Sequence, residues 1–337
     1  IAVLTDPPPL VGPRPPAPEV PPPGPDALRE AERRLAEARA DVAPLGATPY
    51  VVTVSDLTAF ARSPAALYAA RLEPRLEAAV ESAGEEYAGP ESGPDPGAVR
   101  REERRRLFDE SHGGDGPDDR GGIDRAAVGR ALHRLLEGLP PGAEAAGEDD
   151  LDLVLEEEFD GGAPPGTGDL LRTMVARFLA SGTGRRFAEA LARDEDVRRE
   201  VAFHARIRFP AGGRVGPFEG LLVRGAIDLW LPGSDGVRIV DYKTNAPSRH
   251  LPTPEAVAAW YEEQLRLYAL AAERMLGTDV AGVGLVLVDP AWGEAAPELA
   301  IDVSGPLLER TRGLCRAYAR AALENRWPDS VEAFGDD

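Results

Sequence analysis

Apolar residues recur along the chain with two different spacings, and the spacing changes near residue 196. Before that point they return every three or four positions, as in helices with one buried face. After it, apolar and polar residues alternate over several short stretches, as in strands. The pattern predicts helices at 124–137, 168–180, 184–195, 255–276 and 307–324, and strands at 197–209, 218–231, 237–243, 280–288 and 299–303. The sequence therefore predicts an α/β fold, in which helices flank a mixed sheet and a helical elaboration precedes it.

The same pattern divides the chain into three segments. Residues 1–50 are predicted to be a proline-rich linker with one short helix. Residues 51–195 form the helical part of the domain and carry acidic loops rich in Gly and Pro. Residues 196–337 form the α/β core. The chain begins at Ile1 rather than at Met, so we expect a fragment of a longer polypeptide or a processed chain.

A single cysteine limits the metal chemistry of the chain. Cys315 cannot form a disulfide within the chain. Zinc sites built on cysteine and iron–sulfur clusters need several thiolates, so we expect neither of them. No stretch approaches 18 consecutive apolar residues, and the N-terminal segment lacks the layout of a signal peptide. We therefore expect no membrane segment and a cytoplasmic location.

The formal net charge of −20 opposes binding to nucleic acid, because affinity for DNA comes largely from Lys and Arg that neutralise phosphates. The charge is unevenly distributed, however. Residues 141–165 hold nine acids and no base, whereas arginines cluster at 100–106 and at 185–199. Each arginine cluster fits either a basic channel for a strand or a solvated helix face with alternating Glu. The sequence leaves both interpretations open.

Lysine is almost absent from the chain. Of the 38 basic residues, 37 are arginine, and the only lysine is Lys243. Abundant Ala, Gly, Pro and Arg indicate a GC-rich genome, in which Lys codons drift to Arg wherever Arg serves equally well. A lysine that persists alone is a candidate for chemistry that arginine cannot perform, although chance can also leave one survivor.

That lysine lies among carboxylates. Asp241 and Lys243 are two apart on a predicted strand and therefore share one face, while Tyr242 points to the other. Asp228 lies on the preceding strand, and pairing of the two strands brings it beside Asp241. Two close carboxylates repel each other unless a cation lies between them, and a hard divalent ion fits such a site. The alternative is a solvated strand end after a hairpin.

Asp228, Asp241 and Lys243 resemble the D…(D/E)xK signature of the restriction-endonuclease-like nuclease superfamily. The surrounding sequence resembles the RecB/AddA-type nuclease domain of bacterial helicase–nucleases. The resemblance extends from about Val51 to Trp327 and rests on five segments in the family's order: 54–64 (VSDLTAFARSP), 129–137 (GRALHRLLE), 225–228 (GAID), 240–244 (VDYKT) and 261–268 (YEEQLRLY). It implies a restriction-endonuclease-like mixed sheet.

The resemblance also implies roles for particular residues. It makes His133, Asp228, Asp241 and the backbone carbonyl of Tyr242 ligands of Mg²⁺ or Mn²⁺. Lys243 would act on the attacking water or the scissile phosphate. Two further residues, Gln264 and Tyr268, lie four apart on one helix face and would support the site or touch the strand, although both can be structural. Glu200 opens the first core strand and is a candidate further acidic site residue, although we expect a solvated strand start there.

The implied activity is metal-dependent hydrolysis of DNA, on unwound single strands, by the C-terminal domain of a helicase–nuclease in double-strand-break repair. The chain lacks the GxxxxGK[ST] loop of the helicase motor, so a motor would precede Ile1 or belong to another chain. A second helicase–nuclease subunit is a further possible partner. The alternatives are a catalytically silent nuclease fold that binds DNA or assembles complexes, and a free-standing RecB-like nuclease.

Overall fold

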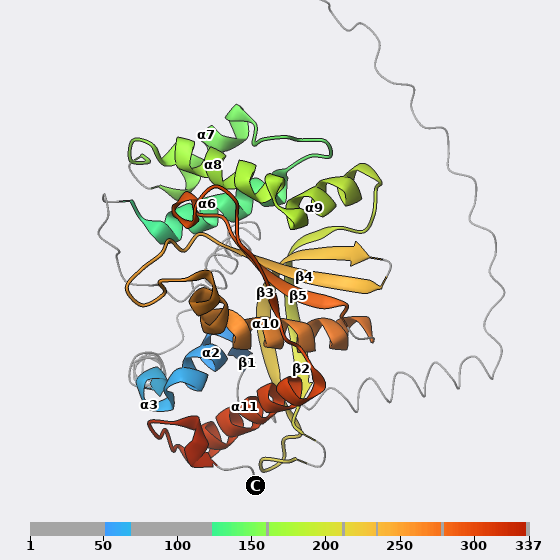
Figure 1. Cartoon of the computed structure of the whole chain (residues 1–337). Helices are drawn as coiled ribbons and strands as arrows, with labels where there is room; N and C mark the ends of the chain where they lie inside the picture. The colour runs from blue at the N-terminus through green and yellow to red at the C-terminus, as the bar shows by residue number, and fades with distance from the viewer. Residues whose placement is uncertain are drawn as a thin grey trace, which may run out of the picture. The chain divides into compact units, whose positions relative to one another are not determined.

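The computed structural model describes residues 51–68, 123–159, 162–210, 213–233, 235–277 and 280–334, which all belong to one compact unit, Thr48–Asp337 (Figure 1). The predicted linker at 1–50 and the arginine cluster at 100–106 lie outside the described residues. Each of the ten predicted helices and strands is present, with ends within three residues of the prediction. None of the described helices is long and apolar enough to cross a bilayer.

The described strands form one mixed sheet, which confirms the predicted fold class. The long strand β3 lies at its centre. Strand β2 pairs antiparallel along one edge of β3, while β1 (parallel) and β4 (antiparallel) share the other edge. Strand β5 runs parallel to β4, and β6 runs antiparallel to β5. The six strands are β1 (Val51–Thr53), β2 (Arg198–Arg208), β3 (Gly220–Gly233), β4 (Gly236–Lys243), β5 (Gly282–Leu287) and β6 (Glu298–Ile301).

The edge shared by β1 and β4 contains a gap. Strand β1 pairs with β3 as far as Arg224, and β4 begins to pair with β3 at Leu229. Asp228 therefore lies where β1 and β4 diverge, so its side chain can meet groups from β4. The sequence did not predict β1, because three residues are too short to show an alternating pattern.

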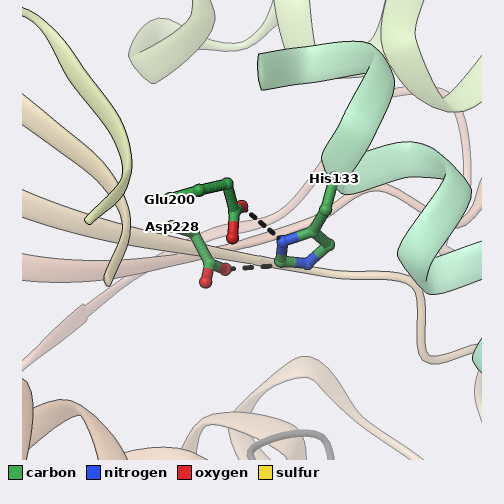
Figure 2. Close-up of side chains that lie close together, drawn as sticks. All are labelled: His133, Glu200 and Asp228. Atoms are coloured by element: carbon green, nitrogen blue, oxygen red, sulfur yellow. Dashed lines mark hydrogen bonds and ion pairs between the residues drawn. The ribbon is translucent and has the colours of Figure 1, made fainter. Parts of the chain in front are cut away.

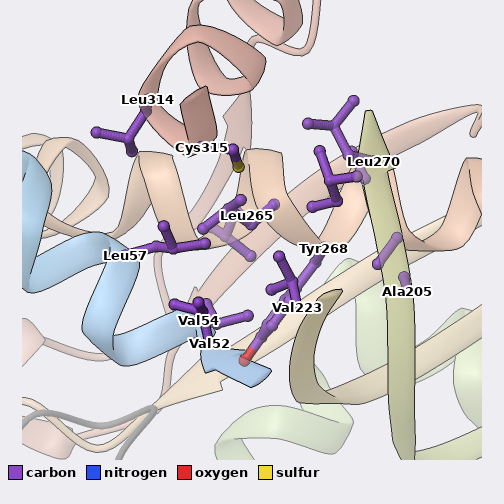
Figure 3. Close-up of a cluster of buried hydrophobic side chains, with 14 of the residues drawn as sticks. Val52, Val54, Leu57, Ala205, Val223, Leu265, Tyr268, Leu270, Leu314 and Cys315 are labelled. Atoms are coloured by element: carbon purple, nitrogen blue, oxygen red, sulfur yellow. The ribbon is translucent and has the colours of Figure 1, made fainter. Parts of the chain in front are cut away.

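Helices α2 (Val54–Arg62), α10 (Pro254–Leu276) and α11 (Gly305–Glu324) cover one face of the sheet. Figure 3 shows Leu57 of α2, Leu265 of α10 and Cys315 of α11 gathered beside Val223 of β3. Each buried leucine contributes about 1.5–3 kcal/mol relative to an exposed one. This core fixes the position of α10, which carries two of the predicted site residues.

Helices α6 (Arg125–Gly138), α8 (Thr167–Ala180) and α9 (Gly182–Ala192) cover the other face. Asp124 caps α6, because its Oδ1 accepts hydrogen bonds from the backbone N–H groups of Ala126 and Ala127. Leu132 of α6 and Phe178 of α8 pack in the same cluster as Tyr242 of β4. The core on this face thus places α6 over the end of β4.

Polar contacts tie these helices to the sheet. Arg125 of α6 pairs with Asp289, which follows β5, at 2.9 Å. Arg177 of α8 donates to the backbone carbonyls of Val288 and Ala295, both at 3.0 Å. Glu298 of β6 accepts from the N–H of Gly182 at 2.6 Å and so caps α9. The helical cover and the C-terminal strands are therefore held together at one end of the sheet.

The remaining described elements are short or peripheral. Helix α7 was not predicted, because its sequence holds mostly acids and buries only Leu151 and Val154. Helix α7 spans Glu148–Glu158. The other short elements among the described residues are α3 (Pro64–Leu67), η2 (Pro290–Trp292) and η3 (Val331–Phe334).

The second arginine cluster, at 185–199, is engaged within the chain. Arg199 donates to the carbonyls of Leu136 and Leu139 at the end of α6. Arg198 pairs with Asp196, and Arg193 pairs with neighbouring glutamates. For this cluster, these contacts favour the interpretation of a solvated helix face with neighbouring acids over that of a basic channel for a strand.

The alternation of side chains along β2 and β3 is interrupted at one matched pair, Glu200 and Asp228. Ile227 and Trp230 of β3 belong to the core under α10, whereas Leu229 belongs to the core under α6, so the two faces exchange at Asp228. Strands β2 and β3 pair in the same register before and after this point, from Arg199 opposite Leu229 to Val201 opposite Ile227. Glu200 and Asp228, which lie opposite each other between these pairs, are not themselves paired in the ladder. Glu200 has a φ of 48°, a left-handed conformation that is costly for a non-glycine residue.

Candidate active site

Asp241 and Lys243 form a buried ion pair on β4. Lys243 Nζ lies 2.8 Å from Asp241 Oδ2, and both side chains are about 1% exposed. As predicted, they share one face of β4, because Tyr242 between them packs in the core on the other face. The Lys243 ammonium also lies 4.8 Å from the centre of the Tyr261 ring of α10, within the range of a cation–π contact.

Helix α10 holds the other carboxylate oxygen. Gln264 Nε2 donates to Asp241 Oδ1 at 3.2 Å and to the hydroxyl of Tyr268 at 2.9 Å. The two side chains lie on one face of α10 because they are four residues apart. Gln264 and Tyr268, both predicted at the site, therefore lie there and fix the orientation of Asp241.

Asp228 lies beside this pair. Its Oδ2 accepts a hydrogen bond from the backbone N–H of Tyr242 at 3.2 Å. Burial raises the pKa of Asp228 well above its usual value, and repulsion from the charges of Asp241 and Glu200 raises it further. Lys243 and the Tyr242 N–H oppose this rise in pKa without cancelling it. A further cation beside Asp228 would lower its pKa and favour its anionic form.

His133 and Glu200 complete the cluster from α6 and β2. Figure 2 shows the carboxylates of Glu200 and Asp228 on the same side of the His133 ring. His133 Nδ1 lies 2.8 Å from Glu200 Oε1, and His133 Nε2 lies 3.8 Å from Asp228 Oδ2. The hydroxyl of Tyr242 donates to the same Glu200 oxygen at 3.2 Å.

The expectation that Glu200 is a solvated strand start was wrong. Its side chain is only 8% exposed and contacts both His133 and Tyr242. Residues Arg198–Glu200 are all charged, a pattern typical of a solvated strand start, so the sequence did not indicate that Glu200 belongs to the site. Pairing the two predicted strands in register would have revealed it, because regular pairing sets Glu200 opposite Asp228.

Lys243 remains charged in this setting. Burial alone would lower the pKa of the Lys243 ammonium, but the negative charges of Asp241 and Asp228 outweigh that effect, so its pKa lies above the usual value. Apart from their mutual contact at 2.8 Å, neither Lys243 Nζ nor Asp241 Oδ2 has a hydrogen-bond partner among the described residues. Both atoms thus keep capacity for water, a metal ion or a phosphoryl oxygen.

Among the described residues, one group of side chains fits a divalent metal ion. Ligand atoms of His133, Glu200 and Asp228 lie within 4.8 Å of one another. An imidazole nitrogen with carboxylate oxygens is a donor set that Mn²⁺ and Mg²⁺ accept. Of the predicted ligands, His133 and Asp228 belong to this group, and Glu200 joins them. Asp241 binds Lys243 and Gln264 instead, and its role as a ligand stays a prediction, as does that of the Tyr242 carbonyl.

The sequence matches the PD-(D/E)XK nuclease superfamily over residues 100–332, and the chain belongs to that superfamily.

The chain is also similar to curated proteins. The chain is 30% identical over 177 residues to an ATP-dependent helicase/nuclease subunit of Pelotomaculum thermopropionicum, covering 50% of this chain and 13% of the relative. It is 36% identical over 179 residues to the corresponding subunit of Desulforudis audaxviator, with the same coverage. The chain thus spans about an eighth of these relatives' length. The crystal structure of SSO0001 aligns over 93% of this chain and 96% of its own, at 14% identity and a TM-score of 0.32.

Proposed function

We propose that this chain is a metal-dependent DNA nuclease that hydrolyses phosphodiester bonds in unwound single strands. The observation that carries the proposal is the convergence of two groups on the diverging strands: the His133, Glu200 and Asp228 cluster and the buried Asp241–Lys243 ion pair. Burying so many charged groups costs folding free energy, because each loses its hydration. A site with this cost is expected to have a function that uses those charges.

The residues divide the chemistry between them. His133, Asp228 and Glu200, together with Asp241, would hold Mg²⁺ or Mn²⁺, which lowers the pKa of a bound water molecule and offsets charge on the phosphoryl group. Lys243 would orient the attacking water or stabilise the developing negative charge. Gln264 keeps Asp241 oriented through its hydrogen bond, and Tyr268 in turn positions Gln264. Glu200 fixes the ring of His133 through Nδ1.

The wider setting is also a proposal. Because the curated relatives are ATP-dependent helicase/nuclease subunits, we propose that a helicase motor in the same polypeptide or complex delivers the unwound strand. Such an enzyme would act in bacterial double-strand-break repair, in the cytoplasm, and a second helicase–nuclease subunit could be its partner.

The direct test is cleavage of labelled single- and double-stranded oligonucleotides by the purified chain, in Mg²⁺, in Mn²⁺ and in excess EDTA. Cleavage should require metal, and Asp241→Asn should lower the single-turnover rate by about 10²-fold or more. Asp235→Asn is the matched control, since Asp235 is an exposed carboxylate in the hairpin of the same two strands. Robust cleavage in EDTA would overturn the metal mechanism. Binding without cleavage in any metal would favour a silent scaffold.

A further inference from the structure

Trp260 of α10 is the most exposed of the four tryptophans in the chain. It is 37% exposed, whereas Trp230 is buried and Trp292 and Trp327 are half-buried. The two half-buried rings donate their indole N–H groups to asparagine oxygens, but that of Trp260 has no hydrogen-bond partner among the described residues. A single exposed apolar residue is common on protein surfaces. What distinguishes Trp260 is how its ring is held and where it lies.

The ring of Trp260 is held by Arg62, the last residue of α2. The guanidinium carbon of Arg62 lies 3.4 Å from the centre of the ring, so the guanidinium covers one face of the indole. Arg62 Nη2 also donates a hydrogen bond to the backbone carbonyl of Trp260 at 3.0 Å. The ring is therefore kept in one orientation while the residue stays 37% exposed. A rigid aromatic surface of this kind binds a flat partner at a low cost in conformational entropy.

The exposed ring lies beside the active site. Trp260 precedes Gln264 by four residues on α10, so the two side chains share one side of the helix, with Cβ atoms about 5–6 Å apart. Gln264 donates to Asp241 Oδ1 at 3.2 Å. The residue after Trp260 is Tyr261, whose ring centre lies 4.8 Å from Lys243 Nζ. Both of these neighbours of Trp260 on α10 thus contact the buried ion pair of the site.

The connection between β4 and α10, residues 244–253, carries positive charge and no acidic residue. The N–H of Ser248 donates to the carbonyl of Leu251 at 3.1 Å, and the N–H of Leu251 donates to Ser248 Oγ at 3.0 Å. The turn that these bonds close leaves Arg249 and His250 exposed. Arg249 has no hydrogen bond or ion pair among the described residues. The segment that joins Lys243 to α10 therefore suits an anionic strand.

We propose that Trp260 is a stacking platform for one unpaired base of the DNA strand that is cut at the neighbouring site. Stacking on an aromatic ring adds affinity for any base, because every base has a flat π face. In a duplex the bases stack on one another and present only their edges in the grooves. The platform would therefore favour the unwound strand. This inference rests on the proposed nuclease function and names a residue that selects its single-stranded substrate.

The test is equilibrium binding by the full chain in excess EDTA, which prevents cleavage. Two single strands of about 12 nucleotides are compared, oligothymidylate and an abasic strand with the same sugar–phosphate backbone. The wild type should bind the strand that carries bases more tightly. Trp260→Leu should lower the ratio of the two affinities by about 5-fold or more, because stacking on one aromatic ring contributes about 1–3 kcal/mol per base. Trp260→Phe keeps an aromatic face and should retain most of the ratio.

Leu276→Ala is the matched control. Leu276 is also 37% exposed and ends the same helix, about 24 Å from Trp260 at ~1.5 Å per residue. This variant should leave the ratio unchanged. A general loss of stability changes both affinities together, so it leaves the ratio as it was and cannot imitate the loss of stacking. A wild-type ratio in Trp260→Leu, or an equal fall in Leu276→Ala, would overturn the inference.

A relaxed closed circular duplex, in which all bases are paired, tests the selection of the unwound strand. Trp260→Leu should leave its affinity unchanged, and a loss equal to that on oligothymidylate would overturn the inference. The proposed function is tested separately, by the single-turnover rate in metal at saturating oligothymidylate. A chain with the expected affinity ratios that cleaves no DNA would support the platform and remove only the nuclease proposal.

Discussion

The Nδ1 atom of His133 lies 2.8 Å from Oε1 of Glu200, although 67 residues separate the two in the sequence. The contact joins α6 to β2 at the residue where β2 adopts a left-handed conformation. A carboxylate on Nδ1 fixes the ring orientation of a histidine and directs Nε2 toward its other partner, here Asp228 at 3.8 Å. Glu200 is therefore placed to control how His133 meets a metal ion.

Two substitutions at Glu200 separate its side chain from its backbone. Glu200→Ala and Glu200→Gly should both weaken Mn²⁺ binding by about 10- to 100-fold, because each removes the carboxylate beside His133. The glycine variant should be the more stable of the two by about 1 kcal/mol, because φ near 48° is unfavourable for a residue with a Cβ atom. Calorimetric Mn²⁺ titration and urea unfolding measure the two effects. Wild-type metal affinity in both variants would exclude Glu200 from the site.

Asp228 makes the metal-free protein sensitive to pH. The pKa of Asp228 is raised by burial and by Asp241 and Glu200, so the folded state keeps this proton at a pH where the unfolded chain has lost it. Protonated Asp228 therefore contributes to the free energy of unfolding at low pH. This contribution is lost as the pH rises through the pKa that Asp228 has in the folded state.

Asp228→Asn, which cannot ionise but can still accept the Tyr242 N–H bond, should therefore raise the Tm in EDTA by at least about 2 °C near pH 8. The gain should shrink as pH approaches the ordinary carboxyl pKa of ~3.9. Adding Mn²⁺ should raise the Tm of the wild type more than that of the variant. Thermal unfolding scans across pH, with and without Mn²⁺, measure these three effects on the Tm. A Tm of the variant below that of the wild type near pH 8 would contradict the proposed repulsion between Asp228 and its neighbouring carboxylates.

Lys243→Arg tests whether the site needs the ammonium group of the lysine or only a positive charge at this position. The Lys243 side chain is enclosed, with 1% exposure, between Asp241 and the Tyr261 ring. A guanidinium is broader than an ammonium, and its donors are fixed in one plane. We expect a loss of about 10²-fold or more in the single-turnover rate, with DNA binding unchanged or tighter. Full activity of this variant would show that the lone lysine reflects codon drift.

Cys315 gives a chemical probe of unfolding. Burial raises the pKa of the Cys315 thiol to about 12, so it is protonated and inaccessible in the folded chain. Because the chain has no other cysteine, modification by a thiol reagent should follow the fraction unfolded. The expected result is no labelling of the native protein and one thiol per chain in concentrated guanidinium chloride. Rapid native labelling would place Cys315 outside the core.

The elements with a repeating pattern were predictable from the sequence. Helix α10 and strand β4 present apolar faces over enough residues to define their period, so Asp241 and Lys243 could be placed on one face. Strand β1 has three residues and depends on pairing with β3, while α7 is stabilised by few buried residues. Both depend on tertiary packing that the local sequence does not encode.

The site was predictable where side chains alternate regularly along a strand, and it was missed where that alternation is interrupted. Asp228 and Asp241 lie on strands joined by one hairpin, so their proximity followed from strand pairing. Glu200 reaches the site because the alternation of β2 is interrupted at that residue. A single left-handed residue changes which face every later side chain occupies, and the sequence carries no glycine there to indicate it.

The interrupted pair of Glu200 and Asp228 also determines where this domain can vary in length over evolution. Eight regular pairs, from Val201 with Ile227 to Arg208 with Gly220, separate it from the connection between the two strands. Residues gained or lost in that connection leave the ladder and the metal ligands in register. A single insertion between Glu200 and Arg208 would instead exchange the faces of the intervening residues. Lineages that diverge in this region should therefore differ in the connection, and a peptide tag inserted there should be tolerated.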